Sequence, residues 1–136
     1  MSASRLTGFT LVEMVVALAA VAMLAVMALP AFQGRLAEAR RGDATAALQR
    51  IQVAQERYRD AHGGYASSLA PLGVGARSSE GLYDLALEAG PGERYVGRAR
   101  ARADGAQAHD TACAEISLHV EQGFATLGPT TRCWAR

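Results

Sequence analysis

The hydrophobic positions of this chain are concentrated in one run near the N-terminus, residues 8–32, whose single charged side chain is Glu13. About twenty apolar residues in a helix cross the roughly 30 Å hydrocarbon core of a bilayer. The run therefore predicts a membrane-crossing helix. Because a charge in hydrocarbon is costly, Glu13 is a candidate functional residue.

Apolar side chains then recur at three- and four-residue spacing through residues 35–62, which predicts a helix with one buried face. These positions are Ala44, Ala47, Leu48, Ile51, Ala54, Tyr58 and Ala61. Gly63 and Gly64 follow and suit the C-terminal cap of a helix. A helix continuing from residue 9 to residue 62 could not bury itself in so small a domain. Its first half would need lipid or other copies of itself, and this need predicts assembly.

Three residues predict weak points in this helix. Proline removes a backbone hydrogen bond and clashes with the preceding turn, so we expect a kink or a local break near Pro30. Gly34 and Gly42 add further weak points, because glycine is a poor helix former. If the chain breaks at Gly42, Asp43 would cap the next helical segment.

Alternation with a period of two predicts three strands after the helix, each with one buried face. The apolar positions are Tyr83, Leu85 and Leu87, then Tyr95, Gly97, Ala99, Ala101 and Ala103, and then Ile116, Leu118 and Val120. A fourth short strand is expected at residues 124–127. Residues 63–82 are predicted to form a loop that Tyr65, Leu69 and Leu72 attach to the domain. The predicted fold class is α+β, with a small antiparallel sheet packed on the outer half of the long helix.

Length and composition limit the function. The 136 residues suit one domain plus a long helix, and the net charge of +1 creates no global field that would attract nucleic acid. The sequence has no glycine-rich phosphate loop, nucleophile elbow or paired carboxylates, so we do not expect an enzyme. Two cysteines with His62, His109 and His119 are too few and too scattered for a metal site, and no cofactor is expected.

The N-terminal run has three interpretations. A removed signal peptide, cut near Leu29-Pro30-Ala31, fits poorly because the usual apolar region is shorter and follows basic residues. A plain membrane anchor fits the length and leaves Glu13 without a role. The third interpretation, which we favour, is a short polar leader ending in Gly8, then Phe9-Thr10-Leu11-Val12-Glu13 and an apolar helix. This pattern resembles the type IV pilin family, and residues 63–73 are similar to the helix-to-sheet loop of PilE-like pilins.

The resemblance implies specific roles. A prepilin peptidase would cut between Gly8 and Phe9, and the new Phe9 amine would be N-methylated. Glu13 would pair with the Phe9 amine of a neighbouring subunit and guide it into register; the alternative is that Glu13 stays unpaired at the headgroup boundary. The helix near Pro30 would unwind when subunits enter the filament.

The resemblance also implies an organisation and a location. The expected parts are a prepilin leader at residues 1–8, a transmembrane and assembly helix at 9–33, and a periplasmic head at 34–136. The head would comprise the amphipathic half of the helix at 34–62, a loop at 63–82, and the sheet with a disulfide-bounded loop at 83–136. The chain would sit in the bacterial inner membrane before assembly and in an extracellular pilus afterwards. Its partners would be other pilins, the prepilin peptidase and methylase, and the inner-membrane assembly platform.

Cys113 and Cys133 suggest one disulfide, because exported chains meet an oxidising compartment. A loop of about twenty residues closed in this way contributes roughly 3 kcal/mol in the chain-entropy model. In pilins the corresponding loop is exposed and often sets what the filament contacts. The alternative is a purely structural role.

Arg98, Arg100 and Arg102 are expected to line one face of a strand, which Arg94 would extend. Such a row can contact phosphates, as in minor pilins that bind DNA during uptake. The alternative, which we favour, is a solvated face paired with acids on neighbouring strands. The candidate acids are Asp84, Glu88 and Glu121.

These observations together predict a minor type IV pilin, a filament subunit that serves adhesion, motility or DNA uptake. Two alternatives stay open: a pseudopilin of a type II secretion system, and a DNA-binding or adhesive pilin at the filament tip. The cysteine pair favours a pilin over a pseudopilin, since the main pseudopilins more often use a calcium loop and no acidic cluster suggests one.

Overall fold

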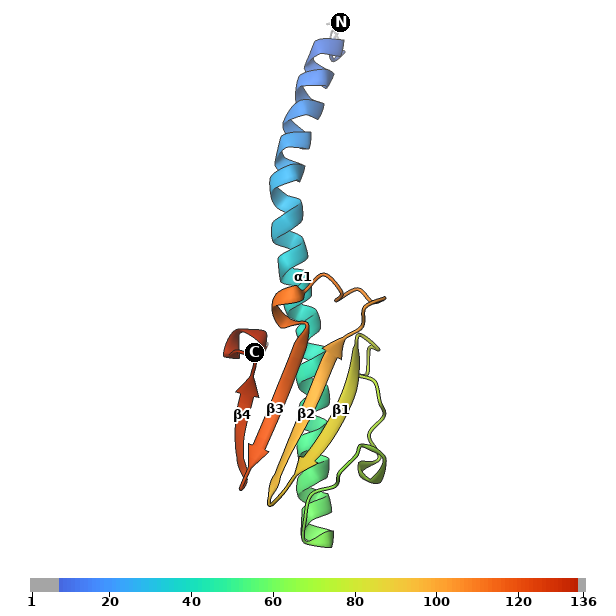
Figure 1. Ribbon diagram of the computed structural model, residues 1–136. Helices are drawn as coiled ribbons and strands as arrows, with labels where there is room; N and C mark the ends of the chain where they lie inside the picture. The colour runs from blue at the N-terminus through green and yellow to red at the C-terminus, as the bar shows by residue number, and fades with distance from the viewer. Residues whose placement is uncertain (1–7, 135–136) are drawn as a thin grey trace, which may run out of the picture. The chain divides into compact units, whose positions relative to one another are not determined.

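The computed structural model describes residues 8–134, so residues 1–7 of the predicted leader lie outside it. The elements, shown in Figure 1, are α1 (Leu11–His62), η1 (Ala70–Leu72), β1 (Tyr83–Gly90), β2 (Arg94–Ala101), η2 (Thr111–Cys113), β3 (Glu115–Glu121), β4 (Phe124–Gly128) and η3 (Thr131–Cys133). The chain divides into two compact units, one ending at Arg35 and the other beginning at Leu36.

The first unit is the apolar part of α1. Every side chain from residue 8 to residue 35 is exposed, and these include large apolar side chains such as Leu24, Met27 and Phe32. By length and composition α1 is able to cross a membrane. Lipid or other protein chains must therefore cover this surface, because so long an apolar surface is unfavourable in water.

The helix α1 continues through all three predicted weak points. Pro30 lies inside it, and no break occurs at Gly34 or Gly42. The prediction of a local break is therefore wrong, while the kink itself stays a prediction. Asp43 accordingly caps no new segment: its side chain is buried, and its Oδ1 accepts a hydrogen bond from the Glu80 backbone N–H at 3.1 Å.

The second unit is a four-stranded antiparallel sheet in the order β1-β2-β3-β4, with α1 running across one face (Figure 1). Leu85, Ala99 and Ile116 stand side by side across the first three strands. The predicted alternation is confirmed, since these side chains point into the core. Gly97 belongs to the same face, where a Cβ atom would lie 3.3 Å from Leu48 Cδ2, so glycine lets α1 approach β2.

One predicted strand is present as expected and another is shorter than predicted. The fourth strand is present, as expected, at Phe124–Gly128. The second strand ends at Ala101, so Arg102 and Ala103 lie outside the sheet. A turn replaces the predicted extension, because Gly105 N–H bonds back to Arg102 O at 3.1 Å.

The buried face of α1 follows the predicted spacing as far as Ile51 and then departs from it. Ala61 is exposed, whereas Gln55 is completely buried. The Gln55 side-chain amide donates to Ala66 O at 2.9 Å and accepts from Ala66 N–H at 2.8 Å. Both polar ends are thus satisfied, which is what allows an amide side chain into a core. Tyr65, Leu69 and Leu72 pack against the core, which confirms how the loop is attached.

Tyr95 carries a pH-dependent part of the stability. Its ring is buried and its hydroxyl finds no hydrogen-bond partner in residues 8–134. Burial raises the pKa of the Tyr95 phenol. The folded state therefore keeps a proton that the unfolded chain loses above pH about 10, so this stability is complete below that pH and is lost as pH rises.

We expect Tyr95→Phe to change the free energy of unfolding by less than about 1 kcal/mol at pH 7, because it removes an unpartnered hydroxyl. At pH 11 the free energy of unfolding of the variant should be higher than that of the parent by about a further 1 kcal/mol, since phenylalanine has no proton to lose. Urea unfolding at the two pH values measures both. Tyr58→Phe, at the surface of α1, is the matched control. An equal gain in the free energy of unfolding at pH 11 in both variants would contradict the assignment of this pH dependence to Tyr95.

Candidate functional site

The N-terminal motif forms the start of α1. Thr10 precedes the helix, and its Oγ1 accepts a hydrogen bond from Glu13 N–H at 3.3 Å. A Thr with a Glu three residues later is the pattern of a capping box, and an acid in the first turn also favours the helix dipole. Gly8, Phe9 and Glu13 are all exposed. The structure shows the Thr10 half of this pattern, a bond to the backbone N–H of Glu13, and places the Glu13 carboxylate in the first turn of α1.

The predicted arginine row lies on the face of the sheet opposite α1, and acids surround it. Arg98 contacts Glu88 at 2.8 Å and Glu115 at 3.6 Å, and Arg100 contacts Glu115 at 2.8 Å. The Glu88 hydrogen bond raises the pKa of the Arg98 guanidinium. These side chains line a shallow hollow of about 420 Å³ in which both signs of charge alternate.

Arg94 begins β2 on the same face as Arg98 and Arg100, whereas Arg102 extends the row only in sequence. Arg102 lies beyond β2 and pairs with Asp104 at 2.8 Å, which lowers the pKa of that carboxyl. Arg94 reaches Glu121 at 3.9 Å. The favoured alternative is therefore confirmed for Arg98 with Glu88, and Glu115 is the partner that the sequence did not indicate. Each of these guanidinium groups therefore lies beside a carboxylate.

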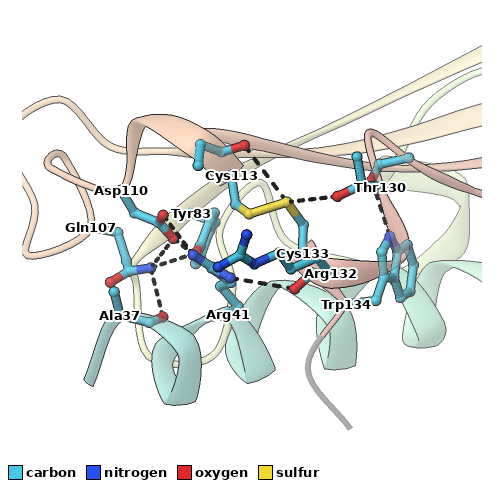
Figure 2. Close-up of a disulfide and its surroundings, with 12 residues drawn as sticks. Ala37, Arg41, Tyr83, Gln107, Asp110, Cys113, Thr130, Arg132, Cys133 and Trp134 are labelled. Carbon is cyan, nitrogen blue, oxygen red and sulfur yellow. Dashed lines mark hydrogen bonds and ion pairs between the residues drawn. A yellow bond between two sulfur atoms is a disulfide. The ribbon is translucent and has the colours of Figure 1, made fainter. Parts of the chain in front are cut away.

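Figure 2 shows a second polar cluster, where α1 meets the connection between β2 and β3. Arg41 Nε donates to Asp110 Oδ2 at 2.7 Å, and its Nη2 donates to Asp110 Oδ1 at 2.8 Å. The two side chains are only 13% and 5% exposed. The Asp110 hydrogen bond raises the pKa of the Arg41 guanidinium. Such a two-pronged pair is strong and geometrically specific.

Gln107 joins the same cluster. Its Nε2 lies within hydrogen-bond distance of Ala37 O, Tyr83 Oη and Asp110 Oδ2. Arg41 Nη1 also donates to Arg132 O at 3.4 Å, next to the disulfide. The cluster therefore holds together α1, the β2–β3 connection and the C-terminal segment (Figure 2).

Sequence reasoning missed this cluster, because residues 104–111 were interpreted only as a polar connection between strands. Gln107 and Asp110 are in fact buried. Nothing in their spacing indicates burial. The burial is explained by distant partners: Arg41 bonds Asp110, from which it is separated by 69 residues, and Tyr83 and Ala37 bond Gln107.

Cys113 and Cys133 form the predicted disulfide, with a sequence separation of 20. Trp134 Nε1 donates to Gly128 O at 3.0 Å and attaches the segment after β4 (Figure 2). Between residues 8 and 134, no group of three or more His, Cys, Asp or Glu side chains is placed to hold a metal ion.

Comparison with protein families gives two matches. The family model described as type IV minor pilin ComP, DNA uptake sequence receptor, matches residues 30–117. The prokaryotic N-terminal methylation motif matches residues 4–29. No curated protein sequence matches the chain. The first match covers the outer part of α1, β1, β2 and the first three residues of β3, and the second covers the end of the leader and most of the apolar run.

Proposed function

The chain belongs to the family of ComP-type minor pilins of type IV pili, and from this we propose that it is an inner-membrane prepilin that joins a pilus and binds DNA there during uptake. The observation that carries the proposal is the family match across more than half of the chain. Proteins of these families are structural subunits that assemble with other pilins, and they are not enzymes. They are also pilins rather than pseudopilins of a secretion system.

The fold supports assembly. The apolar part of α1 is exposed along its whole length, and the chain itself supplies nothing that covers it between residues 8 and 35. Lipid can cover this surface before assembly, and other pilin helices can cover it in a filament. The second unit has its own core and a disulfide, which suit a head outside the cytoplasm.

We propose that processing occurs at Gly8 and Phe9. Mass spectrometry of pili sheared from cells should find a peptide that begins at Phe9 and carries one methyl group, about 14 Da in mass. The peptidase would need the exposed, side-chain-free backbone that glycine provides. The same peptide confined to the membrane fraction would contradict incorporation into a surface pilus. An N-terminus beyond Ala31 would instead indicate a signal peptide and overturn the assembly proposal.

The DNA-binding surface is proposed to lie outside the arginine row. We expect the triple variant Arg98→Gln, Arg100→Gln and Arg102→Gln to keep DNA uptake within about twofold of the parent, because these guanidinium groups already pair with carboxylates. DNA affinity measured against salt concentration should keep its slope. Three lost phosphate contacts would instead reduce a slope of log affinity against log salt by roughly 2.7.

The matched control replaces the same three residues with lysine, which keeps the charges. Pilus yield from shearing must be equal in all strains, so that an assembly defect is not mistaken for lost binding. Loss of uptake in the glutamine variant alone, with pili intact, would make the row the DNA receptor and contradict our assignment.

A further inference from the structure

The two edges of the sheet differ in whether other backbone segments cover them. The edge of β1 is covered by the segment before it: Leu85 N–H donates to Ala76 O at 2.8 Å, and Ser78 N–H donates to Tyr83 O at 3.0 Å. The strand β4 forms the opposite edge. Within residues 8–134 no strand or loop adds a backbone ladder to that edge. An open edge is a template for a further strand.

The turn before β4 determines which of its backbone groups point outward. Gln122 and Gly123 have φ values of 50° and 82°, as in the two-residue turn that fits a twisted hairpin. Such a turn closes on a hydrogen-bonded pair, after which bonded and non-bonded pairs alternate along the strands. The N–H and C=O groups of Ala125 and Leu127 therefore point away from β3.

This edge also lacks the usual protection. Natural edge strands carry charges, prolines or bulges that discourage pairing. No residue of β4 is charged, and the Phe124 side chain is 80% exposed. Pro129 follows the strand and lies beyond the outward-facing groups of Ala125 and Leu127. It limits the length of an added ladder without blocking it.

We propose that β4 pairs in an antiparallel arrangement with β4 of a second copy of this chain, about a two-fold axis at Thr126. In this register Ala125 of each copy faces Leu127 of the other, and each such pair exchanges two backbone hydrogen bonds. Thr126 faces Thr126 of the second copy, and Thr–Thr is a favourable cross-strand pair.

The strand is complementary to itself in this register. Phe124 faces Gly128 of the second copy, which has no side chain of its own. Gly128 has its own reason to be glycine, since a Cβ atom there would lie 2.6 Å from Ser117 Oγ on the same face. No like charges meet, because β4 has none. Four backbone hydrogen bonds and one aromatic contact per copy make a small interface, so the association is weak.

Disulfide cross-linking of the full chain tests the pairing. In a non-hydrogen-bonded antiparallel pair the two Cα atoms lie about 4.5 Å apart, within the range that a disulfide spans. The variant Thr126→Cys in detergent, under mild oxidation, should give several-fold more covalent dimer than Ala86→Cys. Ala86 is an equally exposed position on the other edge strand. The native disulfide must remain intact in both variants.

A second measurement needs no added cysteine. Sedimentation of the full chain in detergent should show a dimer that Thr126→Glu removes, because two carboxylates would then face each other across the axis. The proposal is overturned if Thr126→Cys cross-links no more than Ala86→Cys. It is also overturned if Thr126→Glu leaves the dimer unchanged, or if oxidised cells yield Thr126→Cys joined to a different protein instead.

Discussion

Replacing Arg41 with alanine is expected to lower the free energy of unfolding by about 3–5 kcal/mol, the usual cost of leaving one partner of a buried ion pair unpaired. Asp110 would lose its guanidinium partner in a site where its side chain is only 5% exposed. The hydrogen bond to Arg132 O would be lost as well. Urea unfolding of the full chain in detergent, followed by circular dichroism, measures the change.

Two further variants separate the possible reasons for this loss. Arg41→Lys keeps the charge and loses the two-pronged geometry. Its free energy of unfolding should therefore lie between those of the parent and the alanine variant. The double variant Arg41→Met and Asp110→Leu removes both charges and should recover most of the stability, because a well-packed apolar pair often equals a buried ion pair. A loss below about 1 kcal/mol for Arg41→Ala would show that the pair behaves like one at the surface.

Replacing Glu13 is expected to have the largest effect on assembly. Glu13→Ala should be cleaved normally, yet its amount in sheared pili should fall by at least about tenfold. The loss follows if Glu13 pairs with the amine of a neighbouring Phe9 in an apolar setting, where a missing partner costs a few kcal/mol. Immunoblots of the sheared fraction, normalised to the membrane fraction, measure the ratio.

Glu13→Gln tests whether this role depends on the charge. Glutamine keeps the size of the side chain and the backbone N–H that donates to Thr10 Oγ1, and it removes only the charge. If the charge pairs with an amine, the glutamine variant should fail as the alanine variant does. Normal assembly of Glu13→Gln would show that assembly does not need the charge of Glu13, and it would contradict pairing with an amine.

The strands and the buried helix face were predictable because each depends on local periodicity. Leu85 and Leu87 alternate with exposed residues, and Leu48 and Ile51 recur at helical spacing, so each pattern indicates its own buried side. The disulfide was predictable because the chain has only two cysteines. The N-terminal motif was predictable because its residues are consecutive.

The partners of the arginine row could not be predicted from local sequence patterns. The sequence places Arg98 and Arg100 on one face of a strand. It does not say that Glu115, on the next strand, lies directly opposite Arg100. Register decides that pairing, and register depends on the hydrophobic faces and turns of the whole sheet. A row that looked basic in one strand is therefore balanced by its neighbours.

The sequence by itself determined the apolar run long enough to cross a membrane, the α+β class and the N-terminal methylation motif, because each is carried by neighbouring residues or by a short period. The tertiary structure alone decided the burial of Gln55, Gln107 and Asp110. A polar side chain enters a core only when partners satisfy it, and the partners of these three come from other segments of the chain. The open edge of β4 was decided in the same way, since it depends on which strand lies last in the sheet.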